Sequence, residues 1–165
     1  MDRETLRATQ RPLKARYRET PDAAVITLHA EGSLGEGVTC SVDAGRAMVE
    51  AGLHPATGGG GSNVCSGDML LQALAACAGV TLQAVATNRG VLVSGTVRAE
   101  GDLDVRGTLG VDPEAPVGFR AIRLVFALES AASVEQLAEL ITFTERYCVV
   151  LQTLLTAPSI EVSLA

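Results

Sequence analysis

The sequence has few aromatic residues and no tryptophan. Aromatic residues make up 3% of the 165 residues, which argues against a surface on which bases or sugars stack. Asp and Glu number 19 against 13 Lys and Arg, for a net charge of −6, whereas nucleic acids and anionic membranes bind basic faces. No run of about 18 uncharged apolar residues predicts a transmembrane helix. We therefore expect neither a nucleic acid nor a membrane as a partner.

The N-terminal segment lacks the apolar core of a signal peptide. Its first twenty residues carry charges throughout, so we expect a cytoplasmic protein. With Pro12 and Pro21 as breakers, residues 1–21 predict an N-terminal arm or an irregular lead-in. The remaining residues, 22–165, are enough for one domain with its own core, and 47% of the chain is hydrophobic.

Metal-binding and phosphate-binding signatures are also missing. The four cysteines, Cys40, Cys65, Cys77 and Cys148, form no CxxC pair, and the two histidines lack ligand spacing. The glycine run at 58–61 is not followed by the Gly-Lys-Ser/Thr of a phosphate loop, so we interpret it as a flexible connection. We expect no metal and no cofactor.

The hydrophobic pattern predicts an α+β fold with antiparallel sheets. β-branched runs and alternation predict strands at 23–30, 38–42, 92–104, 118–128 and 160–164, with 46–53 either a strand or a short helix. Glycine-rich turns are predicted at 32–37 and 43–45, and a loop at 55–67. Helical spacing predicts helices at 68–89 and 134–147, with a continuation or a second helix at 148–156. Hairpin connections favour antiparallel pairing over a doubly wound parallel sheet.

The helix at 68–89 carries very few polar residues, which predicts that it is buried nearly all round. One small sheet covers only one side of such a helix, so a second subunit is expected to cover the rest. Gly90 is the expected C-cap of this helix. Ser133 and Gln136 have the spacing of a capping box at the start of the second helix.

The cysteines each allow two interpretations. Cys77 lies among small residues in the middle of the long helix, where burial makes a thiol inert unless a cation from elsewhere activates it. Cys148 is either a core or interface residue or a resolving thiol for Cys77. Cys65 precedes the long helix, whose N-terminus would make it the more reactive thiol on physical grounds alone. Cys40 shares a strand face with apolar residues and is expected in the core. Asp68 either stabilises the first helical turn or orients an arginine at a thiol site.

Two segments resemble the motifs of the OsmC/Ohr family. In that family a glycine-rich loop leads to a Ser-Pro-x-Glu/Asp-Leu-Leu motif and then to a helical Leu-Ala-Ala-Cys. Here residues 65–82 resemble this arrangement, with Gly67 in place of the proline and Cys77 as the cysteine. Residues 145–150 resemble the second motif, in which a cysteine, here Cys148, opens the last helical turns. The resemblance covers roughly residues 22–165.

This resemblance implies an OsmC-like α+β fold, with antiparallel sheets around a long buried central helix in an intertwined homodimer. It further implies a thiol-dependent peroxidase of organic or inorganic hydroperoxides, with sites at the subunit interface. Cys77 would be the peroxidatic cysteine and Cys148 the resolving one, with an external dithiol as reductant. Two alternatives on the same scaffold are a non-catalytic protein that binds a small apolar ligand and a redox sensor that uses Cys65.

In the family, an arginine held by a carboxylate stabilises the reactive thiolate, which makes Asp68 the candidate carboxylate. The family arginine usually lies near the first hairpin turn, but residues 32–37 contain none. Arg16, Arg18 and Arg46 are the remaining candidates for this role, with Arg18 and Arg46 the leading pair.

Overall fold

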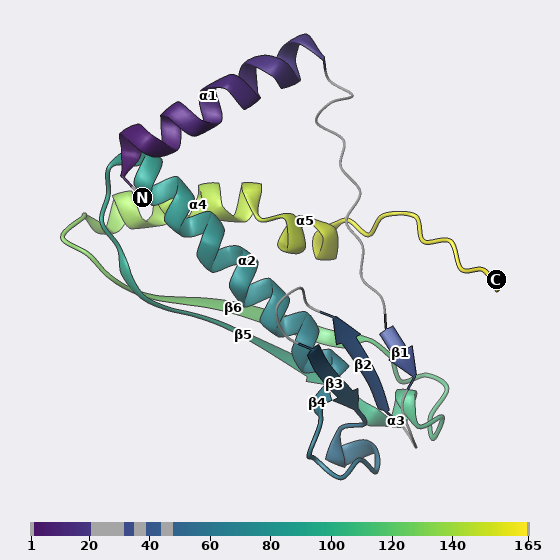
Figure 1. Cartoon of the computed structure of the whole chain (residues 1–165). Coiled ribbons are helices and arrows are strands. Elements are labelled where there is room, and N and C mark those ends of the chain that lie inside the picture. Colours follow the sequence, from purple (N-terminus) through teal and green to yellow (C-terminus); the bar gives the residue numbers. More distant parts are fainter. Residues whose placement is uncertain (1, 21–31, 35–38, 44–47, 165) are drawn as a thin grey trace. The chain divides into compact units, whose positions relative to one another are not determined.

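The computed structural model describes residues 2–20, 32–34, 39–43 and 48–164 (Figure 1). Its elements, in chain order, are α1 (Arg3–Glu19), β1 (Gly32–Leu34), β2 (Thr39–Asp43), β3 (Met48–Gly52), the short 3-10 helix Pro55–Thr57, β4 (Val64–Cys65), α2 (Ser66–Arg89), β5 (Ser94–Leu103), α3 (Val105–Thr108), β6 (Phe119–Glu129), α4 (Val134–Tyr147) and α5 (Val149–Leu155). The chain forms two compact units. The first holds residues 1–13, 73–98 and 125–165, and the second holds residues 14–72 and 99–124.

In the first unit, most of α2 packs against α4 and the neighbouring parts of β5 and β6. The buried side chains of α2 recur every four residues along one face: Leu74, Ala78, Leu82 and Ala86. The core joins Leu82 and Ala86 to Leu140 of α4, with half-buried apolar side chains around them. The predicted helix is therefore confirmed, and its fully buried residues, in the part of the chain that the structure describes, lie on one face. Val80 on another face remains 72% exposed.

The predicted helix ends of this unit are confirmed. Gly90 has a φ of +72°, the left-handed conformation that closes a helix. The Ser133 side chain accepts from the Gln136 backbone N–H, and the Gln136 side chain accepts from that of Ser133, forming the capping box. Cys148 then takes an extended conformation (φ −74°, ψ 106°), so α4 ends there and α5 begins as a separate helix.

The strands β5 and β6 form a two-stranded sheet with Ser94 beside Glu129 at one end and Gly101 beside Phe119 at the other. This places the two strands antiparallel, as predicted. In the second unit, Arg123 of β6 donates to both carboxylate oxygens of Asp102 on β5. The pKa of Asp102 is lowered by this hydrogen bonding.

The second unit contains a small sheet with the strand order β1-β2-β3-β4. β1 pairs antiparallel with β2, and β2 pairs antiparallel with β3 in the register Thr39 to Gly52. Residues 32–34 were predicted as part of a turn but form β1. The predicted loop at 55–67 contains a 3-10 helix and the two-residue strand β4, which pairs in parallel with β3. The predicted strand at 23–30 and the turn at 44–45 lie outside the described residues.

Residues 3–19 form α1, so an irregular lead-in is wrong, whereas the alternative of an N-terminal arm stays a prediction. Asp2 accepts from the Thr5 backbone N–H, a capping contact at the start of α1. Strong helix formers on both sides of Pro12 carry the helix across that residue. Arg7 donates to the side chain and the backbone carbonyl of Asn88, which ties α1 to the end of α2.

The predicted closing strand at 160–164 is absent, because residues after 155 form no regular structure among the described residues. Their alternating apolar side chains are exposed, with Val162 at 93%. By length and composition, α2 is the one helix among the described residues that is long and apolar enough to cross a membrane. The core helix of a soluble protein meets the same criterion, and α2 buries one face in the first unit.

Candidate functional site

The helix α2 holds Cys77 between residues that are fully buried. Leu74 and Ala78, on either side of it in the sequence, are 0% exposed, and Cys77 itself is half-buried. The apolar residues that anchor this helix in the core therefore also determine the face of α2 on which the Cys77 thiol lies. Because α2 begins at Ser66, about three turns before Cys77, this thiol cannot use the N-terminal dipole of the helix, which acts within the first turn.

The break between α4 and α5 holds Cys148. Its backbone N–H donates to the Thr144 carbonyl and its carbonyl accepts from the Gln152 N–H, so the main chain is bonded on both sides of the break. Its side chain is 0% exposed. The first N–H groups of α5, at Val149 and Val150, follow directly and have no carbonyl partner within their own helix.

The structure brings Cys77 and Cys148 together within the first unit, although they lie 71 positions apart in the sequence. Both are free thiols, and the Cys148 thiol donates a hydrogen bond to the Cys77 sulfur. Each thiol therefore affects the pKa of the other, which makes a disulfide between them a testable expectation.

The two thiols have pKa values shifted in opposite directions. Burial pushes the pKa of Cys77 up, but hydrogen bonds from the Val150 N–H, the Cys148 thiol, the Thr81 hydroxyl and the Val149 N–H outweigh it, and the pKa is lowered. Burial also raises the pKa of Cys148, and its hydrogen bond to Cys77 and the nearby charge on that sulfur raise it further. Cys77 is therefore the first of the pair to become a thiolate.

The structure does not test the other predicted site residues as partners of this pair. Asp68 lies exposed in the first turn of α2, in the second unit. Arg16 and Arg18 lie in α1, but their side chains are outside the described part of the chain. Arg46 lies outside the described residues altogether. Cys65 ends β4 in the second unit and is half-buried. Their proposed roles stay predictions.

Sequence reasoning missed the neutral groups around Cys77. The Val149 and Val150 amides carry no side-chain signature, and only the helix break at Cys148 exposes them. Thr81 was visible as one of the few polar residues inside an apolar helix, four positions after Cys77. The groups among the described residues that shift the Cys77 pKa include no guanidinium.

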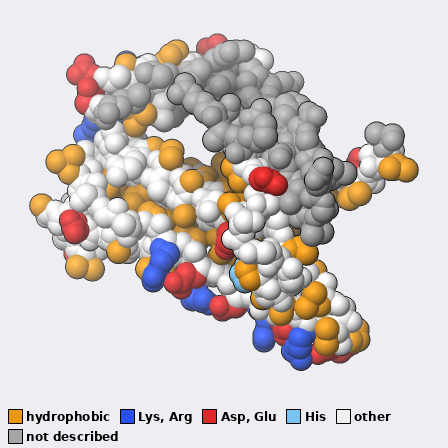
Figure 2. Space-filling view, turned by 60° about the horizontal axis from the view of Figure 1, so that its bottom comes forward, with side chains coloured by type: hydrophobic (Ala, Val, Ile, Leu, Met, Phe, Trp, Pro, Cys, Tyr) orange, Lys and Arg blue, Asp and Glu red, His pale blue; other side chains and the backbone are white. Residues whose placement is uncertain are grey.

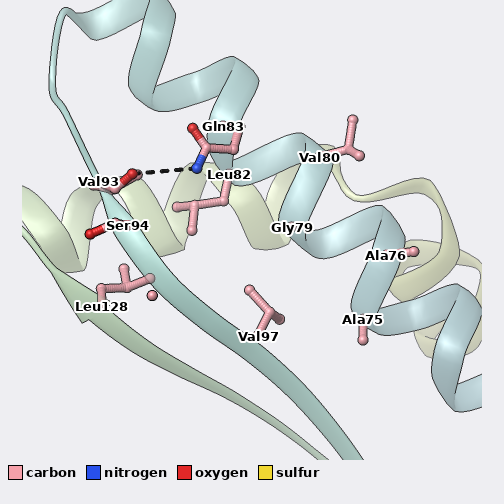
Figure 3. A pocket seen from close by; sticks show the side chains of 11 residues that line it. Ala75, Ala76, Gly79, Val80, Leu82, Gln83, Val93, Ser94, Val97 and Leu128 are labelled. Carbon is pink, nitrogen blue, oxygen red and sulfur yellow. Dashed lines mark hydrogen bonds between the residues drawn. The ribbon is translucent and has the colours of Figure 1, made fainter.

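A separate apolar groove of about 460 Å³ lies in the first unit between α2 and the ends of β5 and β6. Figure 3 shows Leu82, Val97 and Leu128 pointing toward one another, while Val80 points away. Gln83 donates to the Val93 carbonyl at its edge. The residues of α2 that line the groove are 75, 76, 79, 80, 82 and 83, and Cys77 is not among them.

A family model described as OsmC-like protein matches residues 59–163, which include both cysteine motifs. The chain belongs to the OsmC-like protein family. The resemblance inferred from the motifs around Cys77 and Cys148 is thereby confirmed. No protein with a curated description matches the sequence.

Solved structures of OsmC-like proteins confirm the α+β fold. An OsmC-like protein from Mycoplasma pneumoniae is 20% identical with a TM-score of 0.67, covering 80% of this chain and 89% of that one. An organic hydroperoxide resistance protein OsmC from Legionella pneumophila, also described as a predicted redox protein, is 18% identical with a TM-score of 0.59 (79% and 90% covered). The organic hydroperoxide resistance protein OhrB of Bacillus subtilis is 17% identical with a TM-score of 0.55 (81% and 94% covered). At these identities the likeness establishes the fold alone.

Proposed function

We propose that this OsmC-like protein is a thiol-dependent peroxidase that reduces hydroperoxides in defence against oxidative stress. The observation that carries the proposal is the hydrogen-bonded pair of free thiols, Cys77 and Cys148, with opposite pKa shifts. Relatives of similar fold are described as organic hydroperoxide resistance proteins, which supports the same class of substrate.

The chemistry needs one nucleophilic and one resolving thiol. The Cys77 thiolate attacks the terminal oxygen of the hydroperoxide, the O–O bond breaks, and the alkoxide takes a proton and leaves as the alcohol. Cys77 is left as a sulfenic acid. Cys148 then attacks this sulfur, a disulfide forms, and the hydroxyl leaves as water with the proton of the Cys148 thiol. An external dithiol, itself oxidised to a disulfide, returns both cysteines to thiols.

Mass spectrometry after one equivalent of cumene hydroperoxide tests the proposal. We expect a loss of about 2 Da, for two hydrogens, mapping to a Cys77–Cys148 link, and protection of both cysteines from alkylation. Cys77→Ser should abolish the reaction, whereas the matched control Cys65→Ser should leave it intact. An unchanged mass, with every cysteine still alkylated, would contradict the peroxidase.

The apolar groove favours a second candidate function, the binding of a small apolar ligand without catalysis. Its volume of about 460 Å³ lies within the range of small-molecule sites. Failure of the oxidation test, together with ligand-dependent protection against thermal unfolding, would favour this function over the peroxidase.

We also propose a homodimer as the working unit. In the single chain, Val80 of α2 and the alternating apolar side chains of residues 160–164 are exposed, and Figure 2 shows hydrophobic side chains open on the face that it presents. A two-stranded sheet is marginal by itself and gains stability when strands are added to it. Light scattering should give twice the 17.1 kDa chain mass, and a monomer that retains full peroxidase activity would overturn this proposal.

A further inference from the structure

A side-chain hydrogen bond crosses the break between α4 and α5. The Gln152 side-chain Nε2 donates to the Glu145 carbonyl oxygen at 2.8 Å, and the Gln152 backbone N–H donates to the Cys148 carbonyl at 2.9 Å. Glu145 lies in the last turn of α4, and Gln152 lies in α5. The side chain of Gln152 therefore joins the two helices directly, past Cys148.

The bond supplies a partner that α4 needs at its end. The last four carbonyl groups of a helix have no partner within that helix. In α4, the Thr144 carbonyl accepts from the Cys148 N–H, and the Glu145 carbonyl accepts from the Gln152 side chain. An apolar side chain at position 152 would leave the Glu145 carbonyl to water.

The bond also bears on how well Cys148 is covered. Cys148 alone separates the two helices, so rotation about its φ and ψ angles changes the angle between them. The two backbone bonds at the break both end on Cys148 itself, whereas the Gln152–Glu145 bond spans the break and resists this rotation. Cys148 is 0% exposed, but its chain neighbours Tyr147 and Val149 are 55% and 69% exposed. A rotation at the break therefore brings a covered thiol toward solvent.

We propose that Gln152 is a positioning residue, whose bond to Glu145 holds the α4–α5 break closed and keeps the Cys148 thiol covered. An exposed resolving thiol also attacks disulfides in solution, which removes it from its own site. The role of Cys148 as the resolving thiol rests on the proposed peroxidase function. The closure of the break is measured without any peroxide, so the two ideas fail separately.

The test is the rate at which N-ethylmaleimide alkylates Cys148 in a Cys77→Ser protein, followed by mass spectrometry. Gln152→Met keeps the length and the helix propensity of the side chain but removes the donor. A covered thiol reacts only in the fraction of molecules whose break is open. Loss of one hydrogen bond should therefore raise the rate about two- to tenfold. Gln152→Lys, which again ends in a donor, should bring the rate back toward that of the parent protein.

Thr153→Val is the matched control, because Thr153 is exposed, follows Gln152 in α5 and lines the same surface groove of about 420 Å³. It should leave the alkylation rate unchanged. Equal rates for Gln152→Met and the parent protein, with both folded by circular dichroism, would overturn the proposal. If Gln152→Met does not fold, Gln152→Ala against Gln152→Lys decides in the same way.

Urea distinguishes local opening of the break from a general loss of stability. Local opening exposes little surface, so the raised alkylation rate of Gln152→Met should hardly depend on urea below the unfolding transition. Global unfolding exposes far more surface and makes the rate climb steeply with urea. A raised rate that shows this steep dependence would also overturn the proposal.

Hydroperoxide consumption separates this inference from the function. If the protein is a peroxidase, Gln152→Met with all its cysteines should keep the wild-type second-order rate constant for cumene hydroperoxide, because the first step uses Cys77. A constant that falls as the Cys148 alkylation rate rises would show that the substitution disturbs the whole site, against the proposal. If wild type consumes no hydroperoxide, the peroxidase is wrong, while the alkylation rates still decide whether Gln152 keeps Cys148 covered.

Discussion

Oxidation of the thiol pair should stabilise the fold strongly. A disulfide between Cys77 and Cys148 closes a loop of about 70 residues in the unfolded chain. We expect the native state to accept this bond, because the thiols on α2 and at the break before α5 influence each other's pKa. The loss of loop entropy in the unfolded chain then stabilises the native state by about 4 kcal/mol.

Urea unfolding of the reduced and oxidised proteins measures this difference. A chain of this size has a denaturant dependence of about 2 kcal/mol per molar urea, so the midpoint should rise by about 2 M on oxidation. The two samples must have the same protein concentration, because a homodimer makes the midpoint depend on concentration.

Two variants make the measurement specific. Cys148→Ser removes the link and should show no rise after hydroperoxide treatment, whereas Cys65→Ser should rise as wild type does. A disulfide detected by mass, with an unchanged or lower midpoint, would refute the reasoning. It would mean that α2 and the α4–α5 break must be pulled out of their native positions to form the bond.

Three further predictions concern the site and the core. The rate of single-turnover oxidation should rise with pH through a Cys77 pKa below that of a free thiol. Cys148→Ala should move this rise to higher pH, because the thiol that donates to the Cys77 thiolate is lost. Stopped-flow measurements at several pH values test this prediction, and a pH–rate curve that does not shift in the variant contradicts it. Leu140→Ala should lower the free energy of unfolding by about 2–5 kcal/mol, because Leu140 is 1% exposed, whereas Leu92→Ala, at 90% exposed, should change it by less than about 0.5 kcal/mol. Gly95→Ala should lower the free energy of unfolding by about 2 kcal/mol or more, because Gly95 has a φ of +118° and a Cβ there would collide with the Ala127 carbonyl. Gly118→Ala should be nearly neutral, because a Cβ at that position meets open space. Equal melting temperatures for the two variants would contradict the predicted strain at Gly95.

The helices of the first unit were predictable because local signals agree with the tertiary fold. The apolar spacing of α2 and the Ser133 and Gln136 capping box are both short-range patterns, and the structure follows them. The boundaries of α4 agree with the prediction, and α2 begins two residues earlier than predicted. A helix with one buried side has a regular apolar spacing, so a single sequence is enough to predict where that helix lies.

The irregular lead-in at the N-terminus and the closing strand at the C-terminus were wrong for opposite reasons. At the N-terminus, Pro12 was given more weight than the helix formers around it and the Asp2 capping contact. At the C-terminus, residues 160–164 have the alternation of a strand, but no strand among the described residues pairs with them. A strand requires a partner that the pattern itself does not supply, and a second subunit is the partner that we propose.

The thiol site could be predicted only in part from the sequence, because it combines side chains, which the sequence shows, with backbone groups, which it does not. The motifs around Cys77 and Cys148 identified the two sulfurs, but their contact depends on the chain turning at Cys148 so that α5 begins there. The Val149 and Val150 N–H groups that lower the Cys77 pKa belong to the backbone, which every sequence shares, so no residue pattern announces them. Thr81 is the exception, since a hydroxyl four residues after a cysteine in an apolar helix is visible in the sequence. A search for cations alone overlooks it, because hydrogen bonds from neutral donors also stabilise a thiolate.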